Sequence, residues 1–165
     1  MKRGGGKQKG SAFERNVCRL LSNWVSNGKS IDVFWRSSIS GGRATVARKK
    51  GSVVRQAGDI CAVSPEGHDF CDRFFVECKH YKDLQIGKFL LEHKGILAKF
   101  WKHACEQANQ HGREPMMICK ARGPEFVIVR GDTLYWTPEP CIRSQRLRVF
   151  LLKNLLRVPY DHPGI

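Results

Sequence analysis

The chain has 165 residues, 41% of them hydrophobic, and its 29 lysines and arginines against 15 aspartates and glutamates give a net charge of +14. This length fits one domain with a hydrophobic core, and because no apolar run approaches ~20 residues, the sequence argues against a membrane-spanning helix. A charge of this size favours a polyanionic partner, for which nucleic acid is a better candidate than an anionic membrane surface.

The positive charges are grouped in blocks. Residues 33–58 contain six basic residues and no acidic one, and residues 141–160 contain five basic residues and no acidic one. A charge that only kept the protein soluble would be dispersed, whereas blocks of one sign are typical of a surface that binds phosphates. We therefore expect DNA as the partner and no association with a membrane.

The seven cysteines are an odd number, and no two of them have Cys-x-x-Cys spacing. Several, such as Cys18, Cys61 and Cys119, lie singly within apolar segments. This distribution favours reduced cysteines in a core over a disulfide framework or a zinc site. It predicts a cytoplasmic protein, including one bound to a nucleoid or active in a phage-infected cell.

The N-terminal segment divides into an arm and a helix. Residues 1–9 are basic and glycine-rich, which predicts a flexible arm that orders on phosphates. Residues 11–25 carry an apolar stripe at helical spacing, formed by Phe13, Val17, Leu20, Leu21 and Trp24. Ser11 and Glu14 have the spacing of a capping box, so the Glu14 carboxylate is available to the Ser11 backbone amide at the start of this helix.

A strand is expected over residues 31–36, followed by a basic insertion over residues 39–56. Glycines make the insertion mobile, and we interpret it as a loop or β-ribbon that closes over DNA, the alternative being a disordered insertion without function. The cations expected to contact DNA in this insertion are Arg43, Arg48, Lys49, Lys50 and Arg55.

Two short apolar strands are expected over residues 59–63 and 74–78, with turn-forming residues 64–69 between them. A symmetric hairpin would place Asp59 opposite Glu77, with their Cβ atoms roughly 5 Å apart. Facing carboxylates need a neutralising partner, and carboxylate oxygens are the ligands that Mg²⁺ prefers. Lys79 would project from the same strand face as Glu77, and an ordinary salt-bridged hairpin is the structural alternative.

These residues carry a resemblance to a known superfamily. Gly58-Asp59 followed by Glu77-Cys78-Lys79 resembles the PD-(D/E)XK nuclease motif, with Gly58 where the motif has proline. Residues 9–15 resemble the start of the archaeal-type Holliday-junction resolvases within that superfamily. The resemblance spans roughly residues 9–120, most of the chain.

The resemblance implies an α/β fold with a restriction-endonuclease-like core, in which a central mixed sheet is flanked by helices in the order α-β-β-β-α-β. It implies a metal site at Asp59, Glu77 and the Cys78 carbonyl, with Glu14 as an outer ligand instead of a helix cap. Lys79 would orient the attacking water and stabilise negative charge. Mg²⁺ is the expected ion, with Mn²⁺ able to substitute. The phosphate contacts that the resemblance adds are Arg15 and Arg36.

The second half of the chain completes a single domain over residues 10–165. Residues 95–110 should form a helix, with Gln107 at the edge of its apolar stripe; some relatives place a glutamine here near the metals, a role we favour less for Gln107. Strands are expected over residues 115–121 and 125–130, with a further short strand over residues 133–136. Residues 144–158 predict a basic amphipathic helix, and residues 84–92 are ambiguous between helix and loop.

The function that follows is a Mg²⁺-dependent DNA endonuclease of the Holliday-junction-resolvase type, working on branched DNA as a homodimer. A restriction or nicking endonuclease of the same superfamily is the alternative within the enzyme class. A non-catalytic nucleic-acid-binding module on the same fold is the alternative outside it, and the intact Asp59, Glu77 and Lys79 argue against it.

Overall fold

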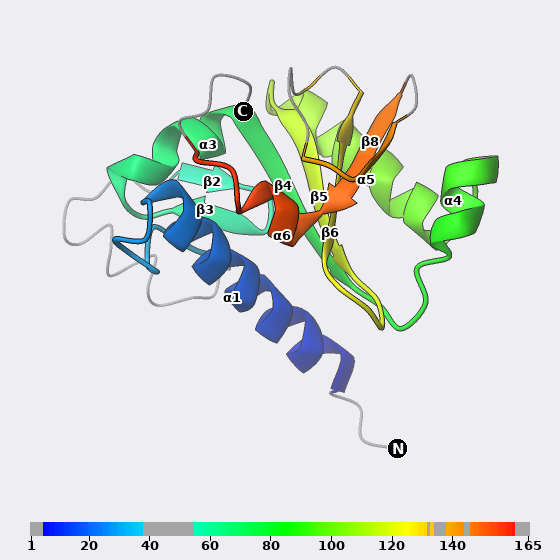
Figure 1. Ribbon diagram of the computed structural model, residues 1–165, viewed down its shortest axis with the longest axis horizontal. Coiled ribbons are helices and arrows are strands. Elements are labelled where there is room, and N and C mark those ends of the chain that lie inside the picture. The colour runs from blue at the N-terminus through cyan, green and yellow to red at the C-terminus, as the bar shows by residue number, and fades with distance from the viewer. Residues whose placement is uncertain (1–4, 38–54, 132, 134–137, 144–145, 161–165) are drawn as a thin grey trace.

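The computed structural model describes residues 5–37, 55–131, 133, 138–143 and 146–160, and its centre is a mixed β-sheet (Figure 1). Neighbouring strands follow the order β4-β5-β6-β8-β7. β4 (Phe74–His80) pairs in parallel with β5 (Glu114–Lys120). β6 (Phe126–Arg130), β8 (Leu147–Leu151) and β7 (Cys141–Arg143) extend the sheet with antiparallel pairs. This arrangement confirms the predicted α/β class.

Helices cover both faces of the sheet. α1 (Gly5–Val25) packs on one face and α5 (Ile96–Gln110) on the other. Because successive strand residues point to opposite faces, β5 divides its side chains between two cores. Met116 and Ile118 join the core under α1, while Met117 and Cys119 join the core under α5. All four are buried, as expected for a strand covered on both sides.

α1 begins at Gly5, so residues 5–9 are helical instead of belonging to a flexible arm. Ser11 therefore lies inside the helix and not at its N-cap, and the predicted capping box is wrong. Lys7, Gln8 and Lys9 are good helix formers, and they continue the helix upstream once the apolar stripe has anchored it.

The predicted hairpin between residues 59–63 and 74–78 is also wrong. β3 (Ile60–Ala62) instead lies between β1 (Phe34–Arg36) and β2 (Arg55–Ala57) in a separate small antiparallel sheet. The segment predicted as a turn holds a 3₁₀ turn, η1 (Pro65–Gly67), and a helix, α3 (His68–Arg73). Phe70 of α3 is fully buried, with its ring 5.4 Å from that of Phe34 and 5.2 Å from that of Phe74. Burial of this aromatic side chain outweighs the local turn chemistry.

The C-terminal prediction of one helix over residues 144–158 is wrong as well. β8 occupies much of its first half, and of the residues described there only Leu152–Leu155 (α6) is helical. Leu147 and Val149 pack in the core under α5, whereas Phe150 packs in the core under α1. An apolar run that can be buried on both faces suits a strand as well as a helix, and pairing with β6 decides the outcome.

Residues 84–92, which were ambiguous between helix and loop, contain the helix α4 (Ile86–Glu92). The strand expected over residues 133–136 lies mostly outside the described residues. Within the described ranges, no helix combines the length and apolar character needed to cross a membrane.

Candidate active site

Asp59 is held against β4 by two backbone contacts. Its amide donates a hydrogen bond of 2.8 Å to the Val76 carbonyl, and its Oδ2 accepts one of 2.7 Å from the Cys78 amide. Gly58 makes this approach sterically feasible. Its φ is +74°, and a Cβ built on it would lie 2.2 Å from the Val76 carbonyl oxygen. The motif glycine therefore has a backbone role that other residues cannot fill without a shift.

Glu77 and Lys79 project from the same face of β4, as their spacing predicts. The Lys79 ammonium donates a hydrogen bond to Glu77 Oε1, and its Nζ lies 5.4 Å from the centre of the Phe100 ring of α5. Cys78 between them is buried with the core under α1. Glu77 and Lys79 are therefore on the α5 side of the sheet, in a partly buried ion pair.

The two carboxylates line a hollow of about 410 Å³ between the strands and α5. The strand side of this hollow contributes Gln56, Gly58, Asp59, Phe75 and Glu77. The other wall consists of His103 and Gln107 of α5, His111 at the C-cap of this helix and Arg113 just beyond it, with the first three spaced four residues apart. The hollow thus places acidic groups opposite hydrogen-bond donors.

Burial and neighbouring charges shift the pKa values of Asp59 and Lys79. Burial, followed by the Glu77 carboxylate, raises the pKa of Asp59 from 3.8 to about 6. Burial opposes the charged form of Lys79, but its hydrogen bond and charge interaction with Glu77 leave the pKa raised. Lys79 is therefore an ammonium at neutral pH, which suits electrostatic stabilisation and not proton abstraction.

The oxygen donors fit a hard divalent cation. Burial and, after it, the negative charge of Glu77 raise the pKa of Asp59, and a bound cation would relieve both effects. The Val76 carbonyl and the Cys78 amide both point to Asp59, so the Cys78 carbonyl faces this same edge of β4. In the described part of the chain, no three His, Cys, Asp or Glu side chains gather closely enough to hold a metal by themselves. The fit therefore rests on two carboxylates and a backbone oxygen.

Glu14 lies apart from the lining of the hollow. Its Oε2 accepts a hydrogen bond of 2.5 Å from Nε of Arg36, and both side chains are partly exposed. Arg36, which was expected to contact a phosphate, therefore forms an ion pair with the Glu14 carboxylate. Glu14 is close enough to raise the pKa of Asp59 slightly, behind the effects of burial and Glu77.

The remaining predicted DNA contacts are placed only in part. Arg15 is exposed on α1. Arg55 lies in β2, but its side chain is outside the described residues, as are Arg43, Arg48, Lys49 and Lys50.

Sequence reasoning missed His103, His111 and Arg113 as members of the site, and it weighed Gln107 near the metals only as the less favoured role. Gln107 was assigned to the edge of the packed stripe, yet it lines the hollow. The spacing of His103, Gln107 and His111 was a usable signal, since residues four apart share a helix face. Nothing in the local sequence identified Arg113, because its position depends on where α5 ends relative to β2.

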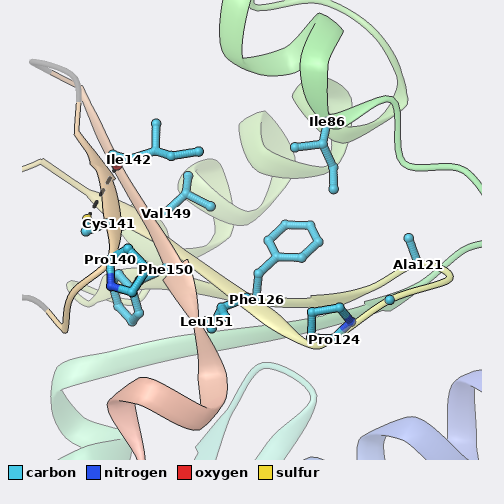
Figure 2. A pocket seen from close by; sticks show the side chains of 11 residues that line it. Ile86, Ala121, Pro124, Phe126, Pro140, Cys141, Ile142, Val149, Phe150 and Leu151 are labelled. Carbon is cyan, nitrogen blue, oxygen red and sulfur yellow. Dashed lines mark hydrogen bonds between the residues drawn. The ribbon is translucent and has the colours of Figure 1, made fainter.

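A second hollow, of about 420 Å³, lies between α4 and strands β6, β7 and β8 (Figure 2). Ile86 of α4 points toward the Phe126 ring, and Val149 and Ile142 lie beside them. Apart from the Cys141 thiol, its lining carries no ionisable side chain. This hollow therefore lacks the acid, base and cation-binding groups found beside Asp59.

Comparison with known proteins identifies the family. A family model described as "Phage putative PDDEXK endonuclease" matches residues 5–140, which include Asp59, Glu77, Lys79 and the α5 wall. No curated protein and no solved structure matches the chain. The match covers most of the sequence and agrees with the mixed sheet and its flanking helices. The chain therefore belongs to the phage PD-(D/E)XK endonuclease family and is a nuclease.

Proposed function

We propose that the protein is a divalent-metal-dependent DNA endonuclease that prefers branched DNA, as the Holliday-junction resolvases do. One observation supports the metal-dependent chemistry: Asp59 and Glu77 line the same hollow, and Lys79 is hydrogen-bonded to Glu77. The excess of cations, +14 overall, supports a nucleic-acid substrate. The preference for branched DNA rests on the resemblance of residues 9–15 to the resolvases.

Asp59, Glu77 and the Cys78 carbonyl would hold the metal, with Mg²⁺ as the expected ion and Mn²⁺ as a substitute. When bound, the metal supplies Lewis-acid stabilisation of the phosphate and lowers the pKa of a water molecule. The Cys78 amide keeps Asp59 oriented through its 2.7 Å hydrogen bond. Lys79 orients the water and stabilises negative charge that develops on the phosphate.

The basic insertion and α1 would bind the flanking DNA. Arg15 is exposed on α1, and the cations of the insertion, Arg43, Arg48, Lys49, Lys50 and Arg55, are proposed to contact phosphates. Paired cuts across a four-way junction need two active sites, so a homodimer is part of the proposal. Light scattering of the protein with and without junction DNA tests that part.

The central experiment compares cleavage of a four-way junction, a linear duplex and a single strand of matched sequence, each with Mg²⁺, Mn²⁺ or EDTA. Symmetric paired cuts in the junction alone, lost in EDTA and in the Asp59→Asn variant, are expected. Cutting of the linear duplex at similar rates would make it an endonuclease without junction preference. Binding without cutting of any substrate, with either metal, would contradict the proposed activity.

A further inference from the structure

Arg113 is a cation of the hollow that lacks a carboxylate partner among the described residues. Lys79, close by, is bonded to Glu77. Partly buried cations elsewhere are paired as well, including Arg36 with Glu14 and Arg130 with Glu114. Arg113 is partly buried and lines the hollow, and its guanidinium donates to the backbone carbonyl of Gln56 as its one side-chain hydrogen bond within the described ranges. A guanidinium carries five N–H donors, so most of them remain available to a ligand.

The end of α5 fixes where Arg113 lies. The Arg113 amide donates a hydrogen bond of 2.9 Å to the Ala108 carbonyl, and the Gly112 amide donates one of 3.1 Å to the Asn109 carbonyl. With Gly112 at a φ of +63°, these two bonds form a Schellman motif. The backbone of Arg113 is thus set by the helix terminus, and its side chain emerges beside the hollow at a defined point.

His111 adds a second donor beside Arg113. Its ring stacks on that of Phe75, with a centroid distance of 5.5 Å and an interplanar angle of 13°. Phe75 is buried in β4 next to Val76, so the stacked ring is supported by the sheet. His111 and Arg113 therefore form a supported pair of hydrogen-bond donors on the wall opposite Asp59 and Glu77.

We propose that Arg113, with His111 beside it, binds a phosphate of the nucleic-acid strand adjacent to the phosphate that is cleaved. This inference rests on the proposed nuclease function and specifies how the strand crosses the site. The carboxylates with their metal take the scissile phosphate, and the donors of the α5 wall take its neighbour. A guanidinium is suited to this task because it makes two parallel hydrogen bonds to phosphate oxygens. Arg113 is then a substrate-positioning residue.

A purely structural role is the competing explanation. Arg113 follows the C-terminus of α5, where a cation interacts favourably with the helix dipole, and its bond to Gln56 ties β2 to this end of the helix. Such a role predicts a loss of thermal stability and no change in the number of phosphates contacted. The salt dependence of DNA binding separates the two explanations, because it counts those contacts.

The test measures binding of fluorescent duplex and four-way-junction DNA in EDTA, over a range of salt concentrations, for the wild type and Arg113→Gln, Arg113→Lys and Arg130→Gln variants. Arg130→Gln is the matched control, since it also removes one partly buried guanidinium near α5 but outside the hollow. Arg113→Gln should weaken binding roughly tenfold and reduce the log–log salt slope by about 0.9. Arg113→Lys should restore the slope, and Arg130→Gln should leave it unchanged.

Two outcomes would overturn the proposal. If Arg113→Gln lowers the melting temperature while the salt slope and affinity stay at wild-type values, Arg113 is a structural cap. That result would leave the proposed function intact, because cleavage by the wild type is scored separately. If the wild type binds no DNA of either shape, both the phosphate contact and the DNA substrate are wrong.

Discussion

The backbone amide of Cys78 donates a hydrogen bond of 2.7 Å to Oδ2 of Asp59, which lies in the turn between β2 and β3 of the smaller sheet. This bond joins the two halves of the sequence motif. One carboxylate oxygen of Asp59 is oriented by the backbone of β4, while the side chain as a whole lines the hollow together with Glu77. The motif is therefore assembled by contact between a loop and a strand edge, not by pairing within a hairpin.

Asp59→Asn should abolish cleavage while preserving DNA binding. The amide keeps the shape of the side chain and its acceptor for the Cys78 amide, but it removes one of the two proposed anionic metal ligands. We expect the cleavage rate to fall by at least roughly 10²-fold, with binding in EDTA unchanged or tighter because a negative charge near the phosphates is lost. Single-turnover cleavage and anisotropy titrations measure the two effects. Loss of DNA binding together with cleavage would show that Asp59 is structural.

The same variant should change how stability depends on pH. A carboxyl group with a raised pKa holds its proton more tightly in the folded state than in the unfolded state. For Asp59, with a pKa of about 6 instead of 3.8, stability is therefore lost as the pH rises from about 4 to about 6, then levels off. By about 1.4 kcal/mol per pKa unit, the loss is on the order of 3 kcal/mol.

Asp59→Asn lacks this titration. The stability of the variant relative to the wild type, measured as the difference between their free energies of unfolding, should therefore increase between pH 4 and pH 8. Urea denaturation at pH 4 and pH 8 in EDTA measures the difference. Adding Mg²⁺ at pH 8 should stabilise the wild type and not the variant, since the proposed metal site needs both carboxylates. If the stability of both proteins depended on pH in the same way, Asp59 would not have a raised pKa.

Gly58→Ala should destabilise the protein and impair cleavage together. Its new Cβ would meet the Val76 carbonyl at 2.2 Å, and the φ of +74° is costly for any residue with a side chain. The backbone conformation alone costs on the order of 1–3 kcal/mol, and relieving the contact would move Asp59 away from β4. Gly123→Ala is the control, because no atom lies within 4 Å of its Cβ position. Denaturation and cleavage assays should show wild-type behaviour for the control alone.

Glu14→Gln should reduce activity less than Glu77→Gln does. Glu14 is paired with Arg36 and does not line the hollow, whereas Glu77 lines it directly. The rate loss for Glu14→Gln should be about tenfold, the low end of the range for residues that support a metal site without touching the metal. Matched cleavage assays over a Mg²⁺ titration give the comparison. Equal losses, rescued in both variants by high Mg²⁺, would make Glu14 a metal ligand.

The sequence predicted the mixed sheet and its two covering helices, and it predicted that Asp59, Glu77 and Lys79 lie close together, because these depend on patterns within short segments. Alternation along β4 placed Glu77 and Lys79 on one face without any knowledge of their neighbours. Pairing partners depend on distant residues, so the hairpin between residues 59–63 and 74–78 was wrong although its main consequence, Asp59 beside Glu77, holds in the hollow.

The wrongly predicted C-terminal helix and the missed Arg113 have the same cause, because both depend on packing between distant segments. An apolar run with cations fits a helix in isolation, and only the free edge of β6 makes residues 147–151 a strand. Arg113 reaches the hollow because α5 ends next to β2, which is a property of packing and not of the residues around Arg113.

α5 has two faces with separate tasks. Leu97, Ala104 and Ala108 are buried against the sheet, while His103, Gln107 and His111 line the hollow. Because the two sets of side chains point in different directions, substitutions on the hollow side need not disturb the buried side. Under the proposed function, His103, Gln107 and His111 would therefore be positions at which DNA contacts could change while the packing of α5 is kept.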